Sequence, residues 1–275
     1  MKQQNRTSKR TIICFIVIAL LFIAALICGI IYFKYMKPYY DAQEMYVNIK
    51  EQVVLELPTE PAIVEPDDDT EPDTELQSRD DVSPIDFVAL SNMSNGEVFG
   101  WLNVPGTVID YPVMQEQTVG EYQYLWTGID GRWNGCGSLF VPAKVGNVKD
   151  AHTLIFGHQM ATKTMFGSLR ANFYSYDAAM NNPTAYLYKK DHAERYDIAL
   201  AATVDMHDDV YQTPYTRNSK DYADMIAHLR DIANYTTNVR LDESRELLVL
   251  STCRAEVSDS ARFIAVFVKT TEWHY

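Results

Sequence analysis

An uncharged run of 23 residues near the N-terminus constrains this chain more than any other feature. Thr11–Phe33 reads TIICFIVIALLFIAALICGIIYF, which is long enough to cross the hydrocarbon core of a bilayer as a helix. Four basic residues and no acid precede it, so the positive-inside rule places residues 1–10 in the cytoplasm. The run is longer than the apolar region of a typical signal peptide, and no clear small-residue cleavage site follows. We therefore expect a single-pass signal-anchor in the cell membrane, with the bulk of the chain extracytoplasmic.

Residues 34–82 separate this run from the rest of the chain. Residues 34–56 hold apolar side chains at loosely helical spacing and can extend the membrane helix. From Glu56 to Asp81 there are eleven acids and one base, with several prolines. Such a composition cannot bury enough apolar surface to offset ordering, so we expect an extended, acidic stalk that lifts the domain off the membrane. The formal net charge of −13 also argues against nucleic acid as a partner.

Residues 83–275 read as one folded, mainly β domain. Ser83, Pro84 and Asp86 form a helix-start pattern. Short apolar segments between turn residues then predict strands and a barrel or sandwich. These segments are 101–104, 107–114, 137–142, 152–157, 184–189, 195–206, 245–253 and 262–273. One amphipathic helix, expected over 219–235, interrupts them before the last two strands.

A thiol and a guanidinium stand at the junction of the last two strands. The segment 245–253 ends in Cys253, and the following segment opens with Arg262. If the two strands pair as a hairpin, both residues lie at the same rim of the sheet. A guanidinium there can stabilise a thiolate or an oxyanion. The alternative, a buried structural cysteine beside a surface arginine, stays open on these residues alone.

His158 is the candidate partner for this thiol. It follows an apolar strand and Gly157, and an imidazole can serve as base or ion-pair partner. The other folded-domain cysteine, Cys136, reads as a buried small side chain. No HExxH or CxxC pattern is present, so we expect no metal and no cofactor.

Taken together, these motifs resemble the sortase family of cysteine transpeptidases, and class B in particular. Gly100–Gln115 looks like the opening strands of that class, and Thr153–Arg170 looks like the segment with its histidine. Leu248–Cys253 looks like the nucleophile motif, and the Arg-Phe-Ile at Arg262 looks like the arginine motif. The helix over 219–235 is similar to the extra helix of class B.

The resemblance implies an eight-stranded sortase-type β-barrel with an N-terminal helix and that extra helix. It implies that His158, Cys253 and Arg262 are catalytic. It further implies that the substrate groove is lined by four other residues, namely Ser251, Thr252, Leu125 and Tyr211.

The implied reaction is an acyl transfer through a thioester on Cys253. The donor would be a sorting-signal peptide of a secreted protein. The acceptor would be an amine of peptidoglycan or of its lipid-linked precursor. A pilus-polymerising sortase, a cysteine endopeptidase and a stalked surface binding domain stay open as alternatives. A peptidoglycan L,D-transpeptidase is disfavoured, because its histidine usually adjoins the cysteine motif, whereas His158 lies 95 residues before Cys253.

Overall fold

The structure is a computed structural model that describes residues 4–55, 82–118, 122–143, 151–212, 214–253 and 258–275. For residues 4–10, Tyr35 and Cys253 it describes the backbone only. The predicted acidic stalk therefore lies outside the described residues.

Eight strands close into a barrel, as predicted. Their order around the barrel is β5-β1-β2-β3-β4-β8-β9-β6, and β5 pairs again with β6 to complete the ring. Each of the eight predicted segments overlaps one of these strands, and a two-residue strand, β7 (Tyr235–Thr236), adds to β6. The strand bounds are β1 Val98–Asn103, β2 Asp110–Gln115, β3 Leu139–Val141, β4 His152–Phe156, β5 Thr184–Tyr188, β6 His192–Asp205, β8 Leu247–Cys253 and β9 Ala261–His274.

The apolar runs of β8 and β9 form the centre of the core. Leu247–Leu250 and Phe263–Val268 are almost completely buried, which matches strands covered on both faces. Helix α6 (Lys220–Ile232) begins at Ser219, whose hydroxyl accepts a hydrogen bond from the Tyr222 amide. The Tyr222 hydroxyl in turn donates to the carbonyl of Ala151, just before β4. This contact ties the predicted extra helix to the barrel.

The short helices differ from the sequence prediction. Helix α3 (Phe87–Met93) begins at Asp86, whose carboxylate caps the amides of Val88 and Ala89. The predicted cap at Ser83 was therefore wrong by three residues. Helices α4 (Leu169–Phe173) and α5 (Tyr176–Asn181) were not predicted, and neither were the one-turn 3-10 helices η3 (Gln123–Leu125) and η4 (Asp209–Tyr211).

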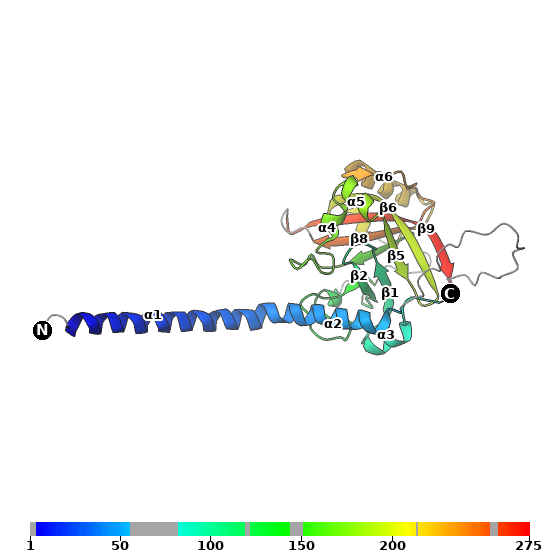
Figure 1. The fold of residues 1–275 in the computed structure, drawn as a ribbon. Helices are drawn as coiled ribbons and strands as arrows, with labels where there is room; N and C mark the ends of the chain where they lie inside the picture. The colour runs from blue at the N-terminus through cyan, green and yellow to red at the C-terminus, as the bar shows by residue number, and fades with distance from the viewer. Residues whose placement is uncertain (1–3, 56–81, 119–121, 144–150, 213, 254–257) are drawn as a thin grey trace, which may run out of the picture.

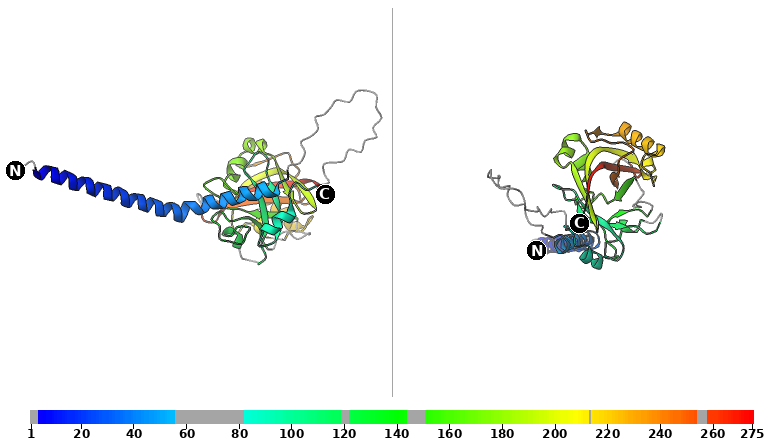
Figure 2. Two further views of the ribbon diagram at one scale, coloured as in Figure 1. Left: turned by 60° about the horizontal axis from the view of Figure 1, so that its bottom comes forward. Right: turned by 90° about the vertical axis from the view of Figure 1, so that its right-hand side faces the viewer.

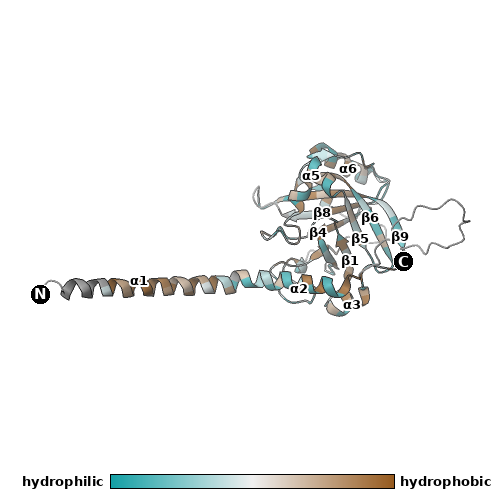
Figure 3. Ribbon diagram, viewed as in Figure 1, coloured by the Kyte–Doolittle hydropathy of each residue, from teal (hydrophilic) through white to brown (hydrophobic). Residues whose placement is uncertain are grey.

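A continuous helix leads from the N-terminus to the barrel. It consists of α1 (Gln4–Ile31), a π-helical turn η1 (Tyr32–Met36) and α2 (Lys37–Val53). Pro38 explains the wide turn, because proline has no N–H and clashes with the carbonyl one turn earlier. Within the described residues, this helix contains the one stretch long and apolar enough to cross a membrane. Its α1 part projects away from the barrel and is apolar (Figures 2 and 3).

Helix α2 packs on the barrel. Its inner face, formed by Ala42, Tyr46, Ile49 and Val53, is buried in the main core cluster. The Tyr46 hydroxyl donates to the carbonyl of Gly137 at 2.6 Å and lies 2.8 Å from the Ser138 hydroxyl. The folded unit of the structure therefore includes residues that precede the acidic segment.

The two flanks of residues 56–81 lie side by side. Val54 and Ile85 form an antiparallel bridge, the Leu55 amide donates to the Pro84 carbonyl, and the Asp86 amide donates to the Val53 carbonyl. The described residues on either side of residues 56–81 are thus joined by backbone hydrogen bonds at the end of α2.

Candidate active site

The ends of three neighbouring strands form one rim of the barrel. Strands β4 and β8 are parallel, with Phe156 opposite Ser251, so both strands end there. Strand β9 is antiparallel to β8, with Arg262 directly opposite Cys253, so β9 begins there. We call this edge the Cys253 rim. In Figure 1 it lies on the side of the barrel from which α1 projects, and the C-terminus lies on the far side.

Two hydrogen bonds join β4 and β8 at Gly157, one residue beyond the end of β4. The Gly157 amide donates to the Ser251 carbonyl at 3.1 Å, and the Thr252 hydroxyl donates to the Gly157 carbonyl at 2.8 Å. His158 follows Phe156 by two residues, and Cys253 follows Ser251 by two. The chain therefore reaches His158 and Cys253 at the same rim, each two residues beyond the last pair of the β4–β8 register.

Glycine is required immediately before His158. A Cβ at Gly157 would approach the Leu139 side chain to 2.5 Å and the Phe166 ring to 2.6 Å. Contacts this short do not occur between carbon atoms, so a larger residue would push the strand end out of place. The sequence motif Gly157-His158 thus has a steric cause.

His158 lies half-buried in a contact with the loop after η3. Its Nε2 is 2.6 Å from the Leu125 carbonyl, and its ring is 4.9 Å from the Trp126 ring. A carbonyl can only accept, so Nε2 carries the proton and Nδ1 is left with the lone pair. Burial lowers the pKa of His158 below its usual value, against the opposing effect of the Leu125 hydrogen bond. The neutral imidazole is therefore favoured at neutral pH.

Arg262 belongs to the same rim, and its guanidinium is held by backbone. Its Nη1 donates to the carbonyls of Asp259 and Ala261 at 2.9 and 3.0 Å. Residues directly opposite one another in an antiparallel pair project to the same face of the sheet. The pairing of Cys253 with Arg262 thus places a positive charge on the face to which the cysteine belongs.

The four residues predicted to bind substrate all lie in or directly beneath the rim. Ser251 and Thr252 are buried, and their hydroxyls form internal hydrogen bonds, Ser251 with the Tyr211 hydroxyl at 2.8 Å. The Tyr211 ring stacks on Phe156, the last residue of β4. Leu125 contributes its carbonyl to His158. These contacts position the rim, and direct contact of the four residues with substrate stays a prediction.

Sequence reasoning missed two features of the rim. Trp126 lies against His158 and is 54% exposed, but an isolated aromatic in a loop carries no periodic signal. At the end of β6, Asp205 bonds to His207 at 2.8 Å. Hydrogen bonds from Ser260 and His207 lower the pKa of Asp205 to about 2. His207 follows β6, which β9 separates from β8, whereas His158 follows β4, which pairs directly with β8. The topology therefore favours His158 over His207 as the partner of Cys253.

Cys136 lies in the core, away from the Cys253 rim. It is a free thiol, buried as predicted, and its Sγ lies 3.9 Å from the Tyr39 carbonyl in α2. Burial raises the pKa of this thiol, which keeps it protonated and unreactive.

A closed eight-stranded barrel with histidine, cysteine and arginine at one rim is the architecture expected of a sortase. Comparison with known proteins agrees. The chain is 28% identical over 165 residues to sortase B of Listeria monocytogenes, covering 59% of this chain and 65% of that protein. It is 23% identical over 183 residues to sortase B of Staphylococcus aureus, covering 64% of this chain and 70% of that protein. The chain is thus a homologue of the class B sortases, and it matches just under two thirds of the Listeria protein. No protein-family model matches the sequence.

Solved structures share the fold. Sortase B of Clostridium perfringens superposes with a TM-score of 0.60 at 22% identity, over 66% of this chain and 98% of that one. Other matched structures are a Staphylococcus aureus sortase B–substrate complex, with a TM-score of 0.59, and a sortase B complexed with triglycine, with a TM-score of 0.58. Both are 22% identical to this chain; they cover 66% of it, and it covers 83% and 84% of them.

Proposed function

We propose that this chain is a membrane-anchored sortase that cleaves a sorting-signal peptide and transfers the new acyl group to a cell-wall amine. The observation that carries the proposal is the register of β4, β8 and β9. Phe156, two residues before His158, lies opposite Ser251, two residues before Cys253, and Cys253 lies opposite Arg262. These three residues, spread over 105 positions of sequence, lie at or within two residues of the ends of three neighbouring strands.

The proposed reaction uses these three side chains in two half-reactions. The neutral imidazole of His158 takes the thiol proton through Nδ1, and the Cys253 thiolate attacks a peptide carbonyl. Arg262 stabilises the oxyanion, an interaction typically worth about 3 kcal/mol per donor. The C–N bond breaks, the departing amine takes the proton from His158, and a thioester remains. An incoming amine then attacks the thioester, its proton passes to His158, and the thiolate is released.

The complexes of relatives support the two substrate classes. A sortase B structure with a substrate and one with triglycine represent an acyl donor and an amine-bearing peptide. Because triglycine carries a free α-amine, we favour a peptidoglycan-type cross-bridge amine as acceptor for this chain.

The continuous N-terminal helix supports a membrane-facing active site. Tyr39 in the first turn of α2 lies beside Gly135. Gly135 belongs to the loop that follows η3, and Leu125, the last residue of η3, accepts the hydrogen bond from His158. Phe33, the last residue of the uncharged run, lies six residues before Tyr39, about 9 Å along a helix. With α1 in the bilayer and residues 1–10 in the cytoplasm, the Cys253 rim would face the outer surface of the membrane.

Mass spectrometry of the full chain in detergent tests the proposal. We expect incubation with a library of sorting peptides to leave a thioester on Cys253, and an added amine to convert it into an amide product. Cys253→Ala should form no adduct. His158→Ala and Arg262→Ala should each lower turnover by roughly 100-fold or more.

Matched controls separate the alternatives. Cys136→Ala removes the buried thiol and should leave the adduct on Cys253. Hydrolysis unaffected by added amine would indicate an endopeptidase, and preference for a lysine side chain over a glycine amine would indicate pilus polymerisation. If a thiol probe labels Cys253 no faster than Cys136 in the folded protein, the catalytic proposal is wrong and a binding domain is favoured.

A further inference from the structure

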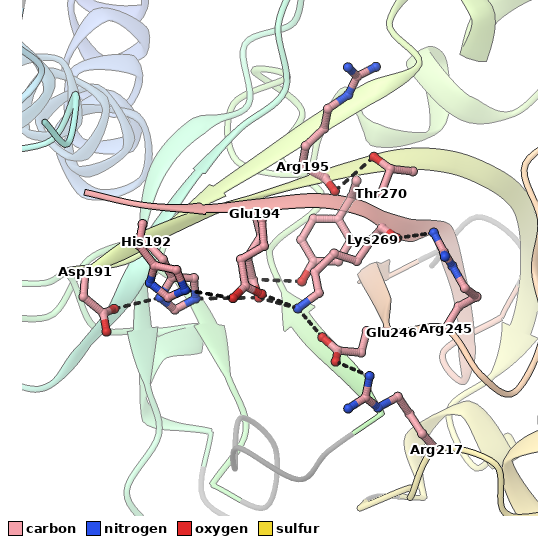
Figure 4. A network of polar contacts seen from close by, with 12 residues as sticks. Asp191, His192, Glu194, Arg195, Arg217, Arg245, Glu246, Lys269 and Thr270 are labelled. Atoms are coloured by element: carbon pink, nitrogen blue, oxygen red, sulfur yellow. Dashed lines mark hydrogen bonds and ion pairs between the residues drawn. The ribbon is translucent and has the colours of Figure 1, made fainter. Parts of the chain in front are cut away.

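A polar cluster lies at the end of the barrel opposite the Cys253 rim. Strand β6 begins there and β9 ends there, with His192 paired to His274 and Glu194 paired to Glu272. Residues two apart on a strand project to the same face, so these four side chains form a two-by-two square on one face. We call them, together with Asp191, the His192 cluster; Figure 4 shows His192 and Glu194 within the wider network.

The side chains of this cluster converge on one another. The His192 and His274 rings are 5.3 Å apart, and His274 Nε2 is 3.3 Å from Glu272 Oε1. Nitrogen and oxygen atoms of His192, Glu194 and Glu272 lie within 4.8 Å of one another, as do those of Asp191, His192 and His274. Tetrahedral zinc, with bonds of about 2.0–2.1 Å, needs its ligand atoms about 3.4 Å apart. Rotation of the exposed His274 side chain can close this gap.

One contact already orients His192 as a ligand. Its Nδ1 lies 2.7 Å from Asp191 Oδ1, while its Nε2 points towards Glu194 Oε1 at 3.8 Å. A carboxylate on one ring nitrogen fixes the tautomer and leaves the other nitrogen to bind a metal, an arrangement found around most metal-bound histidines.

Lys269 forms ion pairs with both carboxylates of the cluster's square, Glu194 and Glu272. Its ammonium contacts Glu272 Oε2 at 2.7 Å and Glu194 Oε1 at 3.2 Å, and it also pairs with Glu246. Glu194 also accepts a hydrogen bond from the Tyr196 hydroxyl. Glu272 keeps Oε1, which faces His274. Because Lys269 and Tyr196 already bind the Glu194 carboxylate, Glu194 is not available to bind a metal ion. The ion pair with Lys269 uses only Oε2 of Glu272 and leaves Oε1 beside His274.

We propose that His192, His274 and Glu272 form a binding site for a divalent transition-metal ion of the zinc class, with Asp191 orienting His192. Two imidazoles and a carboxylate are ligands that Zn²⁺ accepts and that Mg²⁺ or Ca²⁺ would not favour. The ion would join the C-terminal end of β9 to the beginning of β6, 82 residues apart in sequence, and stabilise this end of the barrel. No short motif predicts such a site, because the sheet alone brings the two histidines together.

Zinc binding to the full chain in detergent tests this proposal. The protein carries Cys253→Ala and no affinity tag, so that neither the candidate catalytic thiol nor a tag binds the metal. We expect about one equivalent of Zn²⁺ by titration calorimetry and an unfolding temperature raised by several degrees. Co²⁺ should give the visible absorption of a tetrahedral site.

Substitutions locate the ion. His274→Ala, at a side chain 67% exposed, should abolish the zinc-dependent shift without unfolding the protein, and His192→Ala should do the same. His207→Ala removes another exposed histidine at the opposite rim and should leave binding unchanged. Absence of binding, or binding that survives both His192→Ala and His274→Ala, would overturn the proposal. Since these measurements read metal and stability, they are independent of the transpeptidase reaction.

Discussion

The most perturbed histidine of the chain is outside the candidate active site. His152, the first residue of β4, is fully buried, and its ring nitrogen Nε2 lies 3.0 Å from the Val210 carbonyl. Burial lowers its pKa to about 4, with the hydrogen bond to Val210 opposing this shift. The folded state therefore resists protonation of His152, whereas the unfolded chain takes up the proton near pH 6.5.

This difference predicts an acid-sensitive fold. The contribution of His152 is fully present above pH 6.5 and is lost as the pH falls towards 4, which amounts to about 3 kcal/mol. His152→Gln keeps a donor for Val210 but cannot titrate, so its unfolding free energy should fall less between pH 7 and 4.5. Denaturant unfolding of both proteins at the two pH values measures this. The exposed His207→Gln should behave as wild type, and equal losses in wild type and His152→Gln would contradict the assignment.

Single residues of the candidate site were predictable where a strand ends in an unusual side chain. Apolar periodicity and turn residues made His158, Cys253 and Arg262 candidates, because each stands at or just beyond a strand end, but their catalytic roles came from the resemblance to sortases and stay a prediction. Trp126 was not predictable, because its contact with His158 depends on how the loop after η3 folds back over β4. The side-chain geometry of a site made by three separated segments is determined by tertiary packing, which no local pattern encodes.

Among the elements, α2 packs into the core and also holds a loop of the candidate site. Tyr46 is 4% exposed and bonds to Gly137 and Ser138, and the Ser138 hydroxyl continues to the Thr127 carbonyl at 2.9 Å. One helix side chain thus holds the loop that contacts His158.

We expect Tyr46→Ala to lower the unfolding free energy by about 3–5 kcal/mol, the usual cost of removing a large buried aromatic side chain. Val47→Ala changes a side chain that is 49% exposed on the same helix and should cost less than about 1 kcal/mol. A protein that begins at residue 84 lacks α2 and should melt well below one that begins at residue 37. Equal melting temperatures of these two truncated proteins would indicate that α2 is not part of the folded unit.

Elements with strong periodicity were the predictable ones. All eight barrel strands and α6 were predicted, because apolar runs bounded by turns and a helical stripe are both local signals. Helices α4 and α5 have five and six residues, too few to show a period. The docking of α2 was not predicted, since four apolar residues at loose helical spacing do not distinguish a membrane extension from a packed helix.

On the scale of the whole molecule, the N-terminal helix determines which way the barrel faces. Two exposed tryptophans, Trp126 and Trp133, lie in the loop that contacts the first turn of α2, whereas Trp273 is near the C-terminus on the far side. If α1 spans the bilayer, the first two face the lipid headgroups, where tryptophan is enriched in membrane proteins.

Fluorescence quenching measures this orientation. In vesicles that contain lipids with a quencher in the headgroup, the full chain should lose a substantial part of its tryptophan emission. Replacing both Trp126 and Trp133 by Phe should remove most of that quenching, and Trp273→Phe should leave it intact. Quenching that depends on Trp273 instead would reverse the assigned orientation.

The pairing of Val54 with Ile85 indicates where insertions and deletions can be tolerated in this chain. Both ends of residues 56–81 meet at that bridge, and the helix that joins α1 to the barrel precedes them. If α1 spans the bilayer, the length of residues 56–81 therefore does not set the distance of the barrel from the membrane, in contrast to the stalk suggested by the composition. That distance would depend on the helical turns between the lipid and Tyr46. Relatives could lengthen, shorten or recharge the acidic segment freely, whereas one residue inserted between Phe33 and Tyr39 would rotate the entire barrel by about 100° about the helix axis.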